Sequence, residues 1–147
     1  MKSLTTMLLI LPLATACASS PSKSELDAEV KRLCAIDGGV KVFETVVLPA
    51  NRFDKYGGIR VPSKDDAKSS DDYYVEWHVR HIVDGNPSLR RDQFQLIRRT
   101  DYTLIGEAIS YGRRGGDLPG PSHDSSLRCP ENASDQDLFQ RVFVKSN

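Results

Sequence analysis

The chain has 147 residues, of which 39% are hydrophobic, and its 20 basic side chains equal its 20 acidic ones in number. If the first 16 residues are a cleaved leader, the mature chain has about 130 residues, a length that suits one domain with a single core. The charges balance, so composition gives no argument for binding nucleic acid or anionic lipid headgroups.

The N-terminus is typical of an export signal. Lys2 precedes an apolar run, Leu4 to Leu13, which is shorter than the roughly 20 apolar residues of a transmembrane helix. The run leads into LATAC, which resembles the lipobox of bacterial lipoproteins. In that motif the cysteine thiol is diacylated, the chain is cut before it, and the new amine is acylated. The alternative is an ordinary signal peptide that leaves Cys17 free or removes it.

We therefore expect a signal peptide over 1–16, a lipidated Cys17 with a flexible spacer over 17–24, and one periplasmic domain over 25–147. Ala18, rather than aspartate, favours the outer membrane by resemblance to lipoprotein sorting signals. Several acyl chains hold a protein to a membrane far more firmly than one. The predicted location is the periplasmic side of a bacterial outer membrane.

Two cysteines remain once Cys17 is assigned to lipid. Cys34 and Cys129 can pair in only one way within the chain, and an oxidising periplasm favours a disulfide between them. Two buried thiols or a metal pair are the alternatives, but no CxxC or Cys/His cluster accompanies either residue. We predict no metal and no cofactor.

A helix is expected first, over SELDAEVKRLCAIDGG, with Ser24 as its cap and Asp27 as the capping-box partner. A strand, largely buried, is expected over Val40 to Leu48, where Pro49 stops it. The polar segment that follows is expected to be a long connection, pinned to the body by Phe53, Tyr56 and Ile59.

An antiparallel meander follows in the sequence. Tyr73 to Val83 alternates and predicts a strand with Tyr73, Val75, Trp77, Val79 and Val83 on one face. DQFQLIRR predicts a second strand with Phe94 and Leu96 inward, and TLIGEAISYG a third with Ile105, Ile109 and Tyr111 on one face. Ser134 and Asp137 predict the cap of a last helix, with a short edge strand as the alternative. The expected class is α+β, with about four antiparallel strands and one or two helices on one face.

Three groups of polar residues resemble functional sites, but their spacing argues against each one. His78 and His81 are three apart on a strand, so they point to opposite faces and cannot hold one ion; we expect His81 to be partly buried and His78 exposed. The acidic run PSKDDAKSSDD lacks the alternation and central glycine of an EF-type calcium loop. PSHDSS has no GxSxG elbow to build an oxyanion hole.

GRRGGD is the stretch that we single out. Its glycines allow close backbone approach, and Arg113 and Arg114 offer bidentate contacts to carboxylate or phosphate. Its spacing matches no nucleotide-binding loop. In a structural interpretation an arginine pairs with Asp117 or Glu107; in a functional one the arginines face a partner or an anionic ligand.

The chain also resembles a group of small uncharacterised proteobacterial lipoproteins, through CAIDGGVKVFETVVLP, FDKYG and ISYGRRGGDLPGP with its following CP. The resemblance implies the lipid anchor and the two internal cysteines, and no activity. We expect a non-catalytic binding module of the envelope, with Arg113, Arg114, Asp117 and His123 as the contact surface. The alternatives are a small envelope hydrolase using His123 with Asp117 or Asp124, and a purely structural lipoprotein.

Overall fold

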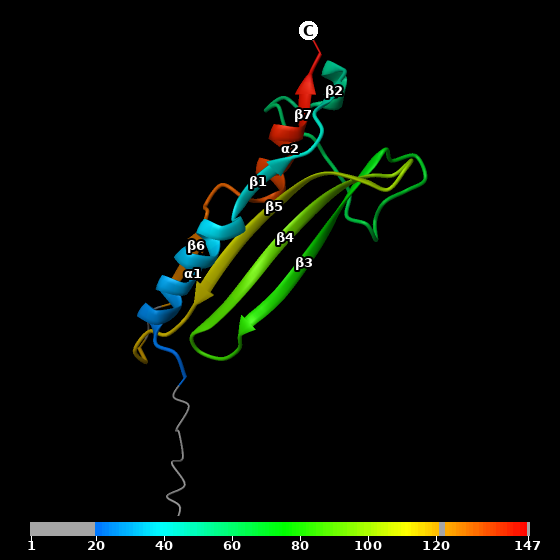
Figure 1. Ribbon diagram of the computed structural model, residues 1–147. Helices are drawn as coiled ribbons and strands as arrows, with labels where there is room; N and C mark the ends of the chain where they lie inside the picture. Colours follow the sequence, from blue (N-terminus) through cyan, green and yellow to red (C-terminus); the bar gives the residue numbers. More distant parts are fainter. Residues whose placement is uncertain (1–19, 121–122, 147) are drawn as a thin grey trace, which may run out of the picture.

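The structure is a computed structural model that describes residues 20–120 and 123–146, and its architecture is α+β (Figure 1). The predicted signal peptide and Cys17 lie outside the described residues. In chain order, the elements are α1 (Lys23–Asp37), β1 (Gly39–Val42), β2 (Val46–Leu48), a 3₁₀ turn (Ala50–Arg52), β3 (Tyr73–Val83), β4 (Ser88–Arg98), β5 (Thr103–Arg114), β6 (Ser126–Cys129), α2 (Asp135–Val142) and β7 (Phe143–Lys145).

The main sheet is antiparallel and has five strands in the order β1-β5-β4-β3, with β6 also beside β5. The first half of β5 pairs with β1, from Gly106 to Ile109, and its second half pairs with β6, from Tyr111 to Arg114. β2 and β7 form a separate parallel pair. The long strand β5 is therefore the centre of the sheet, and β3 is its far edge.

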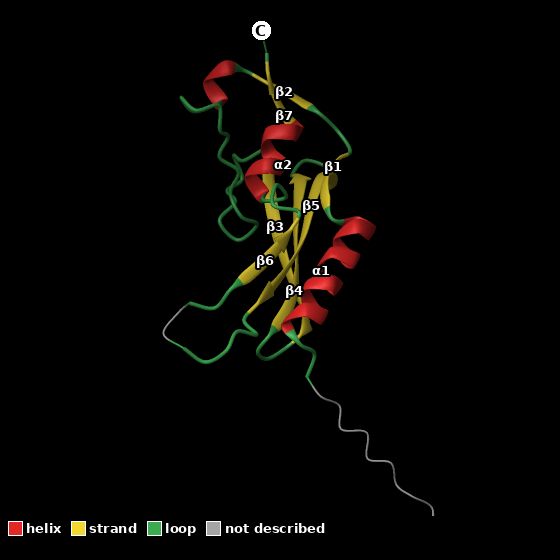
Figure 2. Ribbon diagram, turned by 90° about the vertical axis from the view of Figure 1, so that its left-hand side faces the viewer, coloured by secondary structure: helices red, strands yellow, loops and turns green. Residues whose placement is uncertain are grey.

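Each face of this sheet carries one helix. Leu26 and Val30 of α1 pack on Leu89, Ile109 and Tyr111. On the other face, residues of α2 pack on strand residues of both β4 and β5; this second core includes Leu96, Ile105, Ala108, Leu138, Phe139 and Val142. The two sides are seen in Figure 2, where α1 and α2 flank the sheet. β5 supports both cores because its side chains are buried on both faces.

The predicted capping residues are confirmed for α2 but not for α1. Ser134 and Asp137 form the expected capping box of α2. The first helix begins earlier than expected, with Ser22 as its cap and Glu25 as the capping-box partner. Ser24 therefore lies inside the first turn, and Asp27 is free to bind an arginine from the sheet.

The strand expected over Val40 to Leu48 is two strands. Phe43 and Glu44 both donate their backbone N–H to the carbonyl of Ile105, at 3.0 Å each, after which the chain leaves the main sheet. β2 then pairs with β7 instead. Most of this segment is exposed rather than buried, and only Leu48 is fully inside. In the connection that follows, Ile59 is buried and Phe53 packs on the core, but Tyr56 is exposed.

The meander is present, and β3 has the expected bounds, but two irregularities change which face a side chain occupies. A register shift between His81 and Val83 puts Val83 opposite Leu89, on the α1 face. A second shift, near Ile105, puts this side chain on the α2 face. Ile109 and Tyr111, which were expected to share its face, lie on the α1 face.

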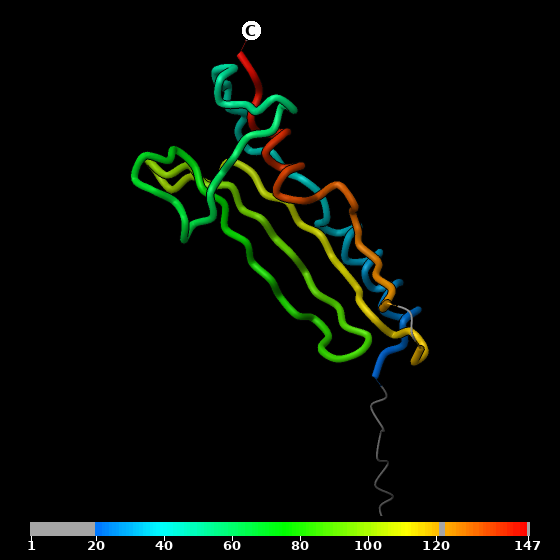
Figure 3. Tube along the Cα trace, turned by 180° about the vertical axis from the view of Figure 1, so that it is seen from behind, coloured from blue at the N-terminus to red at the C-terminus, as the bar shows by residue number. Residues whose placement is uncertain are grey.

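The predicted disulfide is confirmed. Cys34 and Cys129 are bonded, with their Cα atoms 5.8 Å apart. The bond ties the last turns of α1 to β6, beside Tyr111 in the sheet register. The α1 face is thereby fixed, whereas α2 covers only one half of the other face. In the view of Figure 3, no described helix or strand crosses the rest of that face, towards the β3–β4 turn.

Candidate functional site

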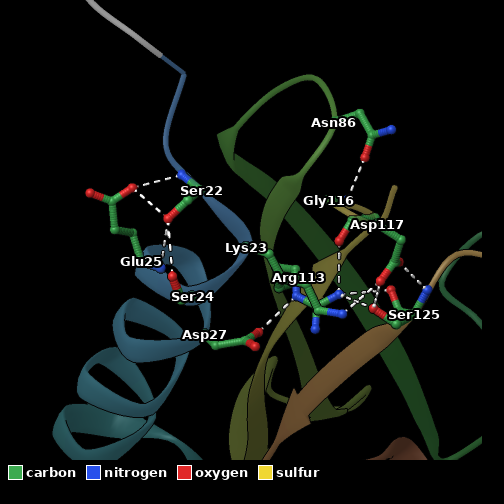
Figure 4. Close-up of polar contacts among 11 residues, drawn as sticks. Ser22, Lys23, Ser24, Glu25, Asp27, Asn86, Arg113, Gly116, Asp117 and Ser125 are labelled. Atoms are coloured by element: carbon green, nitrogen blue, oxygen red, sulfur yellow. Dashed lines mark hydrogen bonds and ion pairs between the residues drawn. The ribbon is translucent and has the colours of Figure 1, made fainter. Parts of the chain in front are cut away.

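The two arginines of GRRGGD lie on opposite faces of β5. Arg113 is 3% exposed and lies on the α1 side. Its Nε donates to Asp27 Oδ1 at 2.7 Å, and its Nη1 donates to the Gly115 carbonyl, the Ser125 carbonyl and the Ser125 hydroxyl at 2.9, 2.8 and 2.8 Å (Figure 4). Arg113 is therefore part of the architecture.

Asp117 holds the same loop to the start of α1. It accepts from Lys23 Nζ at 2.6 Å, from the Ser125 backbone N–H at 2.6 Å and from the Ser125 hydroxyl at 2.9 Å (Figure 4). The ammonium of Lys23 and these two donors keep the pKa of Asp117 well below its usual range. Gly115 and Gly116 have φ of 79° and 82°, a conformation that favours glycine.

This geometry matches the structural interpretation of the loop, but the arginine has a different partner from those expected. Arg113 pairs with Asp27 rather than with Asp117 or Glu107. Glu107 instead accepts from Gln93 at 2.7 Å and from Lys41 at 3.3 Å. Two of the four residues expected at a contact surface, Arg113 and Asp117, are thus engaged inside the protein.

The residues considered for hydrolysis do not converge. His123 and Asp124 are exposed. Within the described residues, no hydrogen bond or ion pair joins His123 to Asp117 or Asp124. The Ser125 hydroxyl donates to Asp117 and accepts from Arg113, so it is held by the loop network.

The two strand histidines lie on opposite faces, as expected. His78 Nε2 is 3.2 Å from Glu76, and His81 Nδ1 is 3.5 Å from Asp84. His81 is exposed rather than partly buried. The reason is its place at the sheet edge: within the described chain, the only segment bridged to β3 on its outer side is at Ser63, opposite Val75.

The open half of the α2 face contains a pocket of about 410 Å³. Directly opposite residues of antiparallel strands share a face, so the register places Arg90 beside Gly112 and Gly112 beside Arg128. We call this the basic pocket. Its lining residues are His81, Ser88, Arg90, Asp92, Gly112, Arg113, Arg114, Ser126, Leu127 and Arg128.

Positive charge dominates this pocket. Arg90 Nε donates to Asp92 Oδ2 at 3.0 Å, and Trp77 Nε1 donates to the other oxygen of Asp92 at 3.1 Å. Arg114 and Arg128 are exposed, and neither has a carboxylate partner among the described residues. Of the three exposed arginines, Arg90 contacts the one buried carboxylate, and Arg128 Nη2 donates to the Ala133 carbonyl at 3.3 Å. The excess of positive charge suits an anion.

A buried hydroxyl lies on this sheet face outside the pocket lining, and the pocket itself has a gap at Gly112. Ser110, 1% exposed, lies opposite Asp92 in the register, and its hydroxyl has no hydrogen-bond partner among the described residues. Leaving a buried hydroxyl unpaired is unfavourable. Gly112 has free space on this face, because a Cβ added there would have Leu127 O as its nearest neighbour, at 3.8 Å.

Sequence reasoning found Arg114 but missed Arg90, Asp92 and Arg128. Alternation was the available signal: polar residues at 90 and 92 precede Phe94 and Leu96 with the same parity, so the inward face of this strand becomes polar towards one end. The strand β6 was not expected at all, and because Arg128 lies on it, the face that Arg128 occupies could not be predicted.

Comparison of the chain with protein families, curated proteins and solved structures found no match. None of the described helices is long and apolar enough to cross a bilayer. Inference about function therefore depends on the geometry of the open face and on the sequence of the N-terminus.

Proposed function

We propose that this protein is a lipid-anchored lipoprotein of the outer membrane that faces the periplasm and acts as a non-catalytic binding module. Its ligand is an anionic component of the envelope, bound in the basic pocket. The observation that carries the proposal is the presence of three exposed arginines, Arg90, Arg114 and Arg128, in a pocket whose described lining contains one acidic residue, Asp92. Exposed guanidinium groups of this kind are suited to bidentate recognition of carboxylate or phosphate.

Binding is favoured over hydrolysis by how the candidate catalytic groups are used. A general base must reach the proton it removes, whereas Asp117 is occupied by Lys23 and Ser125. The basic pocket also holds no nucleophile with an adjacent base: its serines, Ser88 and Ser126, have no hydrogen bond to His81 among the described residues.

The anchor is tested by intact-protein mass and fractionation. Protein purified from membranes should begin at Cys17 and carry the mass of its acyl chains. Cys17→Ser should abolish this added mass and move the protein out of the membrane fraction. An unmodified mature protein in the parent strain would refute the lipoprotein assignment.

The binding surface is tested by crosslinking in intact envelopes. The parent should capture a component that Arg114→Ala/Arg128→Ala fails to capture. Arg80→Ala is the matched control, because Arg80 is an exposed arginine that lies opposite Arg91, on the other face of the sheet. Equal recovery by parent and double variant would argue for a purely structural lipoprotein.

A further inference from the structure

We infer that the basic pocket binds the phosphate monoester group of a membrane-lipid headgroup, in the membrane that carries the anchor. This inference rests on the proposed function and names its ligand.

The charges in the pocket fit a phosphate monoester better than a carboxylate. A phosphate monoester carries about −1.5 to −2 charges near pH 7 and has three terminal oxygens, whereas a carboxylate carries one charge. Arg90, Arg114 and Arg128 come from three different strands, so they can approach one anion from different sides. Each planar guanidinium can donate two parallel hydrogen bonds to such a group. The pocket volume of about 410 Å³ is that of a site for a small ligand rather than for a bare ion.

The pocket lies at the end of the molecule that is tethered. Arg113, which also lines the pocket, donates a hydrogen bond to Asp27 in the second turn of α1, and Asp117 in the adjoining loop accepts one from Lys23. The chain reaches this end near the β3–β4 turn (Figures 1 and 3). Cys17 precedes Ser22 by five residues, which span at most about 18 Å. The anchor therefore keeps the pocket close to lipid headgroups.

Exposed apolar side chains accompany the pocket. Leu118 is 91% exposed and follows Asp117 in the tethered loop. Trp77 and Val79, 57% and 40% exposed, lie on the same sheet face as Arg90 and Asp92. A ligand with an apolar portion can use such surface, whereas free inorganic phosphate cannot. This difference separates the two possible sources of the phosphate group.

The test is a titration of the purified mature protein, in neutral detergent, followed by tryptophan fluorescence. Trp77 is the only tryptophan, and it donates to Asp92, the partner of Arg90, so occupation of the pocket should change its emission. The probes are short-chain phosphatidic acid below its micelle concentration, inorganic phosphate, and a fatty acid of the same chain length. We expect phosphatidic acid to bind at least about tenfold more tightly than either of the others.

Two variants identify the site. Gly112→Val fills the floor from a position where a Cβ meets no protein atom closer than 3.8 Å, so it should weaken binding at least about tenfold with no loss of thermal stability. Arg114→Ala/Arg128→Ala should weaken it as much, whereas Arg80→Ala should leave it unchanged.

Each other outcome overturns a defined part of the inference. Equal affinity for phosphatidic acid and inorganic phosphate would make this a free-phosphate site. Equal affinity for the fatty acid, or normal binding by Gly112→Val, would exclude phosphate recognition in this pocket. If no phosphate probe binds but envelope crosslinking still requires Arg114 and Arg128, the headgroup inference fails and the proposed function stands.

Discussion

Arg113 and Arg114 are neighbours in the chain with opposite roles, because successive side chains of a strand point to opposite faces. Arg113 is buried against Asp27 and Ser125. Arg114 is exposed at the basic pocket. The local sequence is the same for both, so only their parity along β5 distinguishes an architectural arginine from one available to a ligand.

Alanine should separate the two. Arg113→Ala removes the partner of a largely buried ion pair and three further hydrogen bonds, and we expect it to lower the free energy of unfolding by about 3 kcal/mol. Arg114→Ala should change it by less than about 0.5 kcal/mol, as for most surface substitutions. Urea unfolding of the oxidised proteins measures both, and equal values would contradict the different roles.

Asp117 should contribute to the acid sensitivity of the fold. Its pKa in the folded protein is lowered by Lys23 and by Ser125, so its charged form stabilises the fold above the unfolded value of about 3.9. That contribution is lost as the pH falls below this value and through the folded-state pKa. Asp117→Asn should therefore be less stable at neutral pH and lose less stability on acidification.

The measurement for Asp117 is thermal unfolding from neutral pH to about pH 2. Asp124→Asn is the control, since Asp124 is an exposed carboxyl in the same loop and its loss changes the net charge equally. A parallel shift of the whole profile in Asp117→Asn, with unchanged steepness in acid, would contradict the role given to this carboxylate.

At the level of the elements, α2 rests on a glycine of the central strand. A Cβ at Gly106 would lie 2.9 Å from Leu138 Cδ1, 2.9 Å from Val142 Cγ2 and 3.2 Å from Lys41 O. Gly106→Ala should therefore cost about 1 to 2 kcal/mol by displacing α2. Gly112→Ala, on the same face of β5 but over open space, should be neutral or stabilising by up to about 1 kcal/mol.

Denaturant unfolding of this glycine pair tests whether helix contact, rather than strand conformation, decides the result. A similar change in stability at both positions would mean that the packing of α2 does not require a glycine at position 106.

The elements that the sequence predicted best are those with strong local signals. β3 has an alternating pattern between an acidic pair and an Asp-Gly turn, and α2 has a complete capping box. Irregularities in strand pairing have no such signal. The shifts near Ile82 and Ile105 depend on partner strands, so the face of Val83 could not be read from its own segment.

The site was harder to predict because it is assembled from separate strands. Arg90, Gly112 and Arg128 adjoin only through pairing of β5 with both β4 and β6. Alternation alone gives the parity of each residue, but which half of the face α2 leaves open depends on tertiary packing.

For the whole molecule, equal numbers of acidic and basic residues conceal an uneven distribution. Net charge determines long-range attraction, whereas a local group of arginines can still recognise an anion. The neutral composition gave no reason to consider lipid headgroups, but the basic pocket lies beside the tethered end.

The length of the tether should therefore affect headgroup binding. A Gly-Ser insertion that makes the spacer between Cys17 and Ser22 four times longer should lower the effective concentration of headgroups at the pocket about eightfold, because that concentration falls roughly as the −3/2 power of linker length. In vesicles containing phosphatidic acid, Trp77 emission should then report lower occupancy. Binding of soluble short-chain phosphatidic acid should be unchanged, since the pocket itself is not altered. Unchanged occupancy in vesicles would instead mean that the pocket binds a component away from the membrane that holds its anchor.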